Sequence, residues 1–142
     1  MKKFLTTMIL ALLAVPLSIL AAGLMSESPS NAEVYFIYPA EGQTVQGKVK
    51  IVFGLKNMGV APAGTDRKNT GHHHLLIDQE ALPDLAKSLP STDQIKHFGG
   101  GQTETEIELS PGKHTLQLVL GNFVHIPHNK PVMSKKITIT VE

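Results

Sequence analysis

The sequence predicts an all-β protein, an immunoglobulin-like antiparallel β-sandwich with long loops and at most one short helix. Two observations support this class. Apolar and polar residues alternate with a period of two in several short segments, as expected of strands that bury one face. Turn residues separate these segments and helical periodicity is nearly absent, which together favour two packed sheets.

The first half of the chain contains three expected strands. Residues 34–38 are mostly apolar and aromatic, and the run ends at Pro39. Residues 49–55 place apolar side chains at every odd-numbered position, while lysines mark the opposite face. Residues 75–77 form a short apolar run that is typical of a buried strand.

The second half contains three more expected strands. In residues 103–109, threonine, isoleucine and leucine alternate with glutamates. Residues 110–113 carry proline and glycine where a type II turn prefers them, and they lead into a second alternating segment at 114–120. Residues 137–141 alternate again and close the chain.

The connections between these strands are long, and one of them has a helix-like pattern. In residues 79–89, leucine and alanine recur at helical spacing, but Pro83 fits only a first helical turn, so we expect one short helix or a turn. Residues 57–71, 99–101 and 121–132 read as loops. Loops of this length in a compact domain are functional or disordered, and the histidines in or beside them favour function.

A positively charged start followed by an apolar run indicates export. Lys2 and Lys3 precede Phe4–Leu24, a stretch about as long as a short membrane span. Pro16 interrupts this stretch and a polar segment follows it, which favours a signal peptide over an uncleaved anchor. We therefore expect a periplasmic or secreted protein.

Cleavage of the signal peptide is expected after Ala32. Ser30 and Ala32 form the small-x-small pattern that signal peptidase recognises, and Ala22 is the second candidate. The chain then divides into a signal peptide, residues 1–32, and a single β-sandwich domain, residues 33–142.

The charge of residues 33–142 argues against two classes of partner. The whole chain has 13 basic and 12 acidic residues, and removal of Lys2, Lys3 and Glu27 with the leader leaves 11 of each. A domain with zero formal net charge lacks the basic patch that nucleic acid or an anionic membrane requires. The chain also has no cysteine, so stability must come from the core or from a bound metal.

Histidine is the unusual residue in this composition. If the expected strand at 75–77 also includes the preceding histidine triplet, His72 and His74 share one face with Asp78, and His73 lies on the other. A His-x-His pair on a strand can bind one metal ion, because neutral imidazole suits zinc, copper, iron and nickel. The seven histidines are His72, His73, His74, His97, His114, His125 and His128.

Metal binding needs one or two further ligands. His97 stands beside three glycines, which allow a close approach of the backbone, and His125 and His128 lie in the last long loop. A methionine thioether would favour copper(I). His114, at the start of a strand, is expected to be a packed or edge residue. The additional candidate ligands are His73, Met58 and Asp78.

Three functions follow from this pattern. The leading hypothesis is a protein that binds copper or zinc through the histidine cluster. The second is a non-catalytic module that binds a protein or glycan of the cell envelope. In that case the histidines are structural: they brace loops by hydrogen bonds and are not expected to converge in space. The third is a metal-dependent enzyme, which needs a water-accessible pocket and a nearby carboxylate, with Asp78 the first to inspect. No catalytic residue is assigned, since the common nucleophile and metalloprotease motifs are absent from the sequence.

Several blocks resemble a bacterial family known as domain of unknown function 4399. The hallmark is Gly-His-His-His-Leu-Leu-Ile-Asp at residues 71–78, and residues 58–65, 97–104, 111–118 and 125–128 are similar to its other blocks. The resemblance covers most of the domain. It implies an exported β-sandwich protein in which the histidine, glycine and proline blocks are family features, and it implies no activity or ligand.

Overall fold

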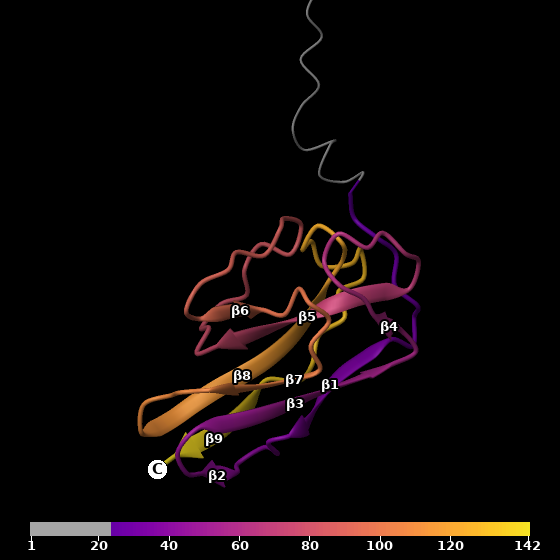
Figure 1. Cartoon of the computed structure of the whole chain (residues 1–142). Coiled ribbons are helices and arrows are strands. Elements are labelled where there is room, and N and C mark those ends of the chain that lie inside the picture. The colour runs from indigo at the N-terminus through magenta and orange to yellow at the C-terminus, as the bar shows by residue number, and fades with distance from the viewer. Residues whose placement is uncertain (1–23) are drawn as a thin grey trace, which may run out of the picture.

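The computed structural model describes residues 24–142, which form a sandwich of two β-sheets (Figure 1). Most of the predicted signal peptide, residues 1–23, lies outside the described residues. Residues 24–142 contain strands, turns and loops but no helix. Within this part of the chain there is consequently no helix of the length and apolar character needed to span a membrane.

The smaller sheet has three antiparallel strands in the order β1-β3-β7. These are β1 (Glu33–Tyr38), β3 (Val49–Lys56) and β7 (Glu104–Ile107). The alternation in β3 directs Val49, Ile51 and Phe53 inward, and each of them is buried. β7 has no further partner in this sheet and is its edge strand.

The larger sheet has the order β2-β9-β8-β5-β4, and β6 also pairs with β5. Its long pairs, β5–β8 and β8–β9, are antiparallel, whereas the two-residue strands β2 and β4 pair in parallel with β9 and β5. β4 and β6 therefore follow one another along the same edge of β5. The strands are β2 (Thr44–Val45), β4 (Gly59–Val60), β5 (Thr70–Ile77), β6 (Ile95–His97), β8 (Gly112–Gly121) and β9 (Ile137–Val141).

The main core lies between the two sheets. The inward side chains of the larger sheet meet those of β1 and β3, and each fully buried leucine or isoleucine contributes about 1.5–3 kcal/mol relative to an exposed one. This core explains the stability of a cysteine-free domain. Its most buried apolar members are Val34, Val49, Ile51, Leu75, Leu116, Leu118, Leu120 and Ile139.

β5 is buried on both of its faces. His73, Leu75 and Ile77 point toward the main core, whereas His72 and His74 share the other face with Leu76. That outer face is covered by the long connections after β5 and β8, which form a second small core with Leu76. The second core consists of Leu76, Leu89, Ile95 and Val119, with Met133 packed against it.

The structure confirms the all-β class and all six strands expected from alternation. Three further strands, β2, β4 and β6, were not predicted because two or three residues are too few to show a period. Residues 79–89 form a turn, in which Asp84 accepts hydrogen bonds from the backbones of Ala86 and Lys87. The apolar residues there do not form one buried stripe, since Leu82 is 48% exposed while Leu89 is 6% exposed.

Candidate metal centre

His72 and His74 lie side by side on the outer face of β5. Residues two apart on a strand point to the same side, and their ring centroids are 4.8 Å apart. Both side chains are fully buried beneath the connecting loops. The pair predicted from the sequence therefore forms, and both of its side chains are shielded from solvent.

His97 joins this pair from β6. The antiparallel register of β5 and β6 sets His97 directly opposite His74, and the two ring centroids are 5.2 Å apart. The centroid of His97 lies 5.0 Å from that of His72. The three-residue strand β6 thus brings a histidine 23 positions beyond His74 into contact with both His72 and His74.

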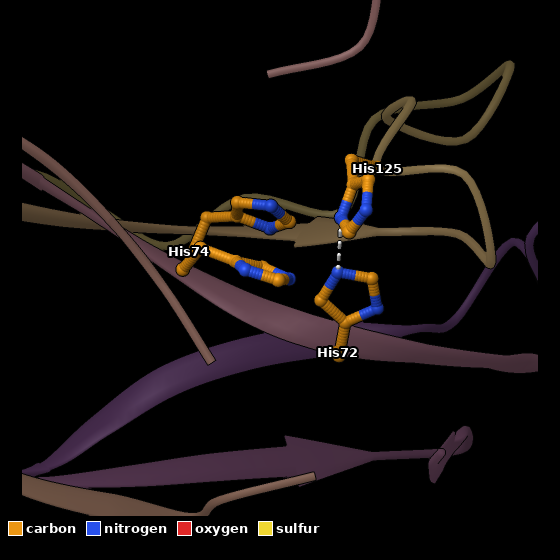
Figure 2. Close-up of side chains that lie close together, drawn as sticks. His72, His74 and His125 are labelled. Atoms are coloured by element: carbon orange, nitrogen blue, oxygen red, sulfur yellow. Dashed lines mark hydrogen bonds between the residues drawn. The ribbon is translucent and has the colours of Figure 1, made fainter. Parts of the chain in front are cut away.

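His125 completes the group from the loop between β8 and β9. Its backbone has φ of 67°, in the left-handed region that few residues other than glycine adopt. The imidazole Nδ1 of His125 lies 3.0 Å from Nε2 of His72, in a hydrogen bond whose donor depends on the tautomers (Figure 2). Its ring centroid is 4.5 Å from that of His97.

Two glycines leave room for the rings. A Cβ atom at Gly99 would lie 2.3 Å from Cε1 of His97, and one at Gly121 would lie 2.6 Å from Cε1 of His74. Real Cβ atoms do not approach other atoms this closely, so any other residue at either position would displace an imidazole. Gly99 belongs to the triplet from which the sequence predicted a close approach, whereas the role of Gly121 was not predicted.

The four imidazoles have the spacing of a metal site. One ring nitrogen from each of His72, His74, His97 and His125 can be chosen so that all four lie within 4.8 Å of one another. Four nitrogens at about 2.0–2.1 Å from a tetrahedral metal ion would be about 3.4 Å apart, so the widest pair would need to close by about 1.4 Å at most. This group, hereafter the histidine cluster, contains no carboxylate.

Half of the eight ring nitrogens of the cluster are buried without a hydrogen-bond partner. Nδ1 of His72, both nitrogens of His74 and Nε2 of His97 are buried without one. The carbonyl of His72 lies toward the His74 ring but outside hydrogen-bonding geometry. An unsatisfied buried polar group costs about 1–3 kcal/mol, so native proteins rarely leave several together.

The cluster keeps its imidazoles neutral. Burial, together with repulsion from the neighbouring His125 and His97, which disfavours a second positive charge, lowers the pKa of His72 to about 4. Burial lowers the pKa of His74 to about 3, with the same kind of repulsion from His72 and His97. Burial and His125 also lower the pKa of His97. At neutral pH each of these three rings therefore has a free lone pair, as a metal ligand requires.

The remaining candidate ligands lie outside the cluster. His73 is on the opposite face of β5, where its ring centroid is 4.9 Å from that of Phe53. His128 is buried, and its Nε2 bonds the carbonyl oxygen of Thr70 at 3.2 Å. Met58 packs against the main core.

Asp78 interacts with His114 instead of the cluster. The strand ends at Ile77, and Asp78 has φ of 51°, which takes it out of the alternation that would have placed it on the same face of the strand as His74. Its Oδ2 lies 2.7 Å from Nδ1 of His114, whose Nε2 is 2.8 Å from the carbonyl oxygen of Ser110. Burial alone would lower the pKa of His114, but these two partners outweigh it and the pKa is raised.

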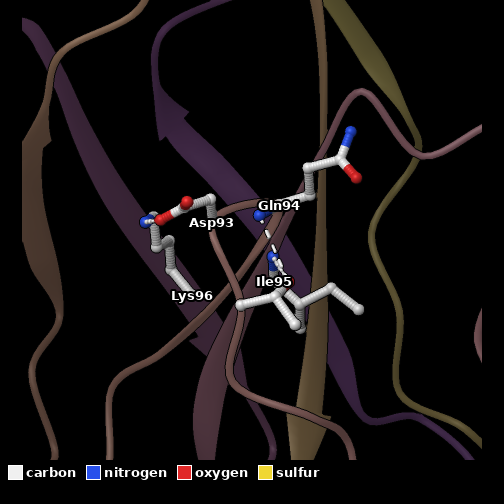
Figure 3. Close-up of polar contacts among 5 residues, drawn as sticks. Asp93, Gln94, Ile95 and Lys96 are labelled. Carbon is white, nitrogen blue, oxygen red and sulfur yellow. Dashed lines mark hydrogen bonds and ion pairs between the residues drawn. The ribbon is translucent and has the colours of Figure 1, made fainter.

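A groove with a volume of about 680 Å³ opens beside His97. It runs between the edge strands of the two sheets, and its polar wall includes Asp93 and Lys96, whose carboxylate and ammonium groups are 3.3 Å apart (Figure 3). His97 is both a member of the cluster and part of the groove lining, so it is the point where the cluster approaches solvent. The groove is lined by Ser91, Thr92, Asp93, Lys96, His97, Phe98, Thr105 and Ile107.

The match to a family model agrees with the resemblance seen in the sequence. The family model described as "Domain of unknown function (DUF4399)" matches residues 51–142. No curated protein matches the chain. Among solved structures, the endo-β-1,4-mannanase from Thermotoga petrophila is similar, with 16% sequence identity and a TM-score of 0.48. That match covers 82% of this chain and 21% of the mannanase chain, so the domain corresponds to about a fifth of that protein.

Proposed function

We propose that this chain, which belongs to the family described as domain of unknown function (DUF4399), is an exported protein that binds one copper or zinc ion. The ligands are His72, His74, His97 and His125 of the histidine cluster. The protein acts in the periplasm or outside the cell, after removal of the apolar leader.

One observation carries the proposal: buried ring nitrogens without hydrogen-bond partners converge from β5 and β6, and His125 meets them from the loop between β8 and β9. If the histidines merely braced loops, their nitrogens would bond backbone or side-chain groups, as the two nitrogens of His114 do. Within the cluster, only His72 and His125 are bonded to each other. A metal ion bound by the lone pairs would replace the missing partners.

The chemistry of the ligand set selects the metal class. Calcium and magnesium prefer oxygen ligands, and the cluster offers none. Neutral imidazole suits copper and zinc, and four nitrogens from two strands and a loop match the ligand count of a closed zinc or copper(I) site. His97 is the one ligand of the cluster that lines the groove, so an ion from solvent would meet this ligand first.

The convergence also weighs against the envelope-module alternative. In that interpretation the histidines shape a loop surface and have no reason to meet, whereas four of the seven have ring nitrogens within 4.8 Å of one another. The enzyme alternative named Asp78 as its carboxylate, and Asp78 is engaged with His114 and with the backbone of Thr115.

The test is metal analysis of the exported protein purified without a histidine tag, followed by calorimetric titration with zinc and copper. We expect one ion per chain with micromolar affinity or better. His72→Ala/His74→Ala should abolish binding. His114→Ala is the matched control, because it removes a histidine from the same strand pair without touching the cluster, and it should bind as the wild type does.

Circular dichroism of each variant separates loss of ligands from loss of fold. Absence of binding in a folded wild-type protein would overturn the proposal. Equal affinity in the wild type and the His72/His74 variant would leave metal binding in place but would disprove this ligand set.

A further inference from the structure

His125 is the only member of the histidine cluster that no strand positions, so its location depends on the loop that carries it. Asn122 organises this loop. Its Oδ1 accepts hydrogen bonds from the backbone N–H groups of Val124 at 3.1 Å and Ile126 at 3.0 Å. Its main-chain carbonyl accepts another from the N–H of His125 at 2.9 Å. The Asn122 side chain is buried, so these bonds are shielded from competing water.

The other half of the Asn122 amide bonds a segment that lies far away in the sequence. Its Nδ2 donates to the carbonyl oxygen of Leu24 at 2.7 Å and to Oγ of Ser26 at 3.1 Å. Both hydrogens of the Asn122 amide are thus donated. These two bonds hold the amide group in the orientation that points Oδ1 toward the loop. The conformation of the His125 loop is therefore connected to residues 24–26.

Residues 24–32, hereafter the N-terminal strap, are attached to the domain along their length. The N–H of Asn129 donates to the carbonyl of Ser26 at 3.0 Å, and Oγ of Ser28 donates to the carbonyl of Lys130 at 2.7 Å. Farther along, Ala32 packs against the main core. In Figure 1 the strap descends beside the loops at the top of the view and continues into β1.

We propose that Asn122 is a positioning residue for the ligand His125, and that the N-terminal strap is a permanent part of the mature domain that holds Asn122 in place. This inference rests on the proposed metal site. It also distinguishes the two expected cleavage points: a cut after Ala22 keeps the strap, whereas a cut after Ala32 would remove both acceptors of the Asn122 amide. The structure thus favours processing before Leu24.

The first experiment is intact-mass measurement of the protein recovered after export of the full chain. We expect an N-terminus at or before Leu24. A mature protein that begins at Glu33 would overturn the role of the strap.

The second experiment measures metal affinity in isosteric variants of the full chain. Asn122→Asp retains the oxygen that bonds the loop but loses the donor to the strap. A neutral hydrogen bond is worth about 0.5–1.5 kcal/mol, and a buried carboxylate would in addition repel the two strap oxygens, so we expect copper or zinc affinity to fall at least about 3-fold. Asn57→Asp is the matched control: it loses the bond from Nδ2 to the carbonyl of Asn31 at the other end of the strap, and its affinity should stay within about twofold.

A double substitution distinguishes positioning of His125 from general loosening of the fold. In a His125→Ala background, Asn122→Asp should cause no further loss of metal affinity, because the ligand that it positions is absent. An equal loss in both backgrounds, or no loss in either, would disprove the positioning role. A wild type that binds no metal would overturn the proposed function together with this role, whereas the mass measurement tests the strap in either case.

Discussion

The two ends of the β5–β8 strand pair hold histidines in opposite environments. At one end, His72 and His74 are buried among other imidazoles, and most of their nitrogens lack partners. At the other end, both ring nitrogens of His114 are bonded, one to the carboxylate of Asp78 and one to a backbone carbonyl. The pKa of the first two is lowered and that of the third is raised. The partners of an imidazole, more than its place on a strand, therefore decide whether it is a structural group or a candidate ligand.

The largest expected difference between the two ends is in acid stability of the metal-free protein. An unfolded histidine binds a proton below pH 6.5, whereas folded His72 does so only near pH 4. Stability contributed by such a group is present above pH 6.5 and is lost as pH falls toward the folded pKa. Because His73 and His74 are shifted in the same direction, we expect the free energy of unfolding to fall by at least about 2 kcal/mol between pH 7 and pH 5. Urea unfolding of the metal-free protein at both pH values measures this, and a flat profile would contradict neutral buried rings.

The second prediction is that replacing a histidine has opposite effects on the stability of the metal-free protein at the two ends of the strand pair. His74→Leu should leave the metal-free protein as stable as before, or stabilise it by up to about 1–3 kcal/mol, because it removes two orphaned buried nitrogens. The same change should abolish metal binding. His114→Ala should destabilise the protein by about 1 kcal/mol, because it removes satisfied hydrogen bonds and leaves metal binding intact. Thermal unfolding with and without zinc compares the two variants, and destabilisation of similar size in both would break the contrast.

The third prediction tests whether the space that Gly99 leaves for the His97 ring is needed for metal binding. Gly99→Ala places a methyl group against the His97 ring, so we expect metal affinity to fall about 10-fold, equivalent to about 1.4 kcal/mol. Gly100→Ala is the neighbouring control, since its methyl group would meet only the flexible side chain of Gln102. Competition titration against a chelator gives both affinities. Equal values in the two alanine variants would argue that His97 is not a ligand.

The smallest expected effect concerns Asp78. The raised pKa of His114 means that the ion pair stabilises the fold at low pH and that this contribution is lost as pH rises through the folded pKa. Asp78→Asn keeps a residue that tolerates the left-handed backbone. Because Asp78 is partly exposed, we expect a loss of about 1 kcal/mol or less at pH 5.5 and a smaller one at pH 8. Chemical unfolding at the two pH values would detect the difference, and a larger loss at pH 8 would contradict the charged pair.

The sequence was sufficient for the fold and for the pairing of His72 with His74, for the same physical reason, and it named His97 and His125 as candidates to join them. Alternation along a strand is a local property, so it predicted the main strands and also the shared face of His72 and His74. The convergence of His97 and His125 depends on strand register and on a left-handed loop residue, neither of which is local. The only sequence feature that indicated close packing around His97 was the run of glycines that follows it.

Two features of the site had no usable signal in the sequence. In the sequence, Asp78 continues the alternation of the histidine strand. In the structure the strand ends one residue earlier, and the positive φ of Asp78 turns its side chain to His114. Asn122 was inside a predicted loop, but its hydrogen bonds to residues 24–26 join segments about a hundred positions apart. Pairings of that kind become visible only when the chain is folded.

The absence of cysteine gives the histidine cluster a further consequence. Its four members come from β5, β6 and the β8–β9 loop, so an ion bound by all of them would close chain loops of 23 residues between His74 and His97 and 28 residues between His97 and His125. Closing such loops restricts the unfolded chain as a disulfide does. The ion would then be a reversible cross-link that reductants leave intact and chelators open, so that the supply of metal, rather than the redox state of the compartment, would control the stability that this cross-link adds to the core.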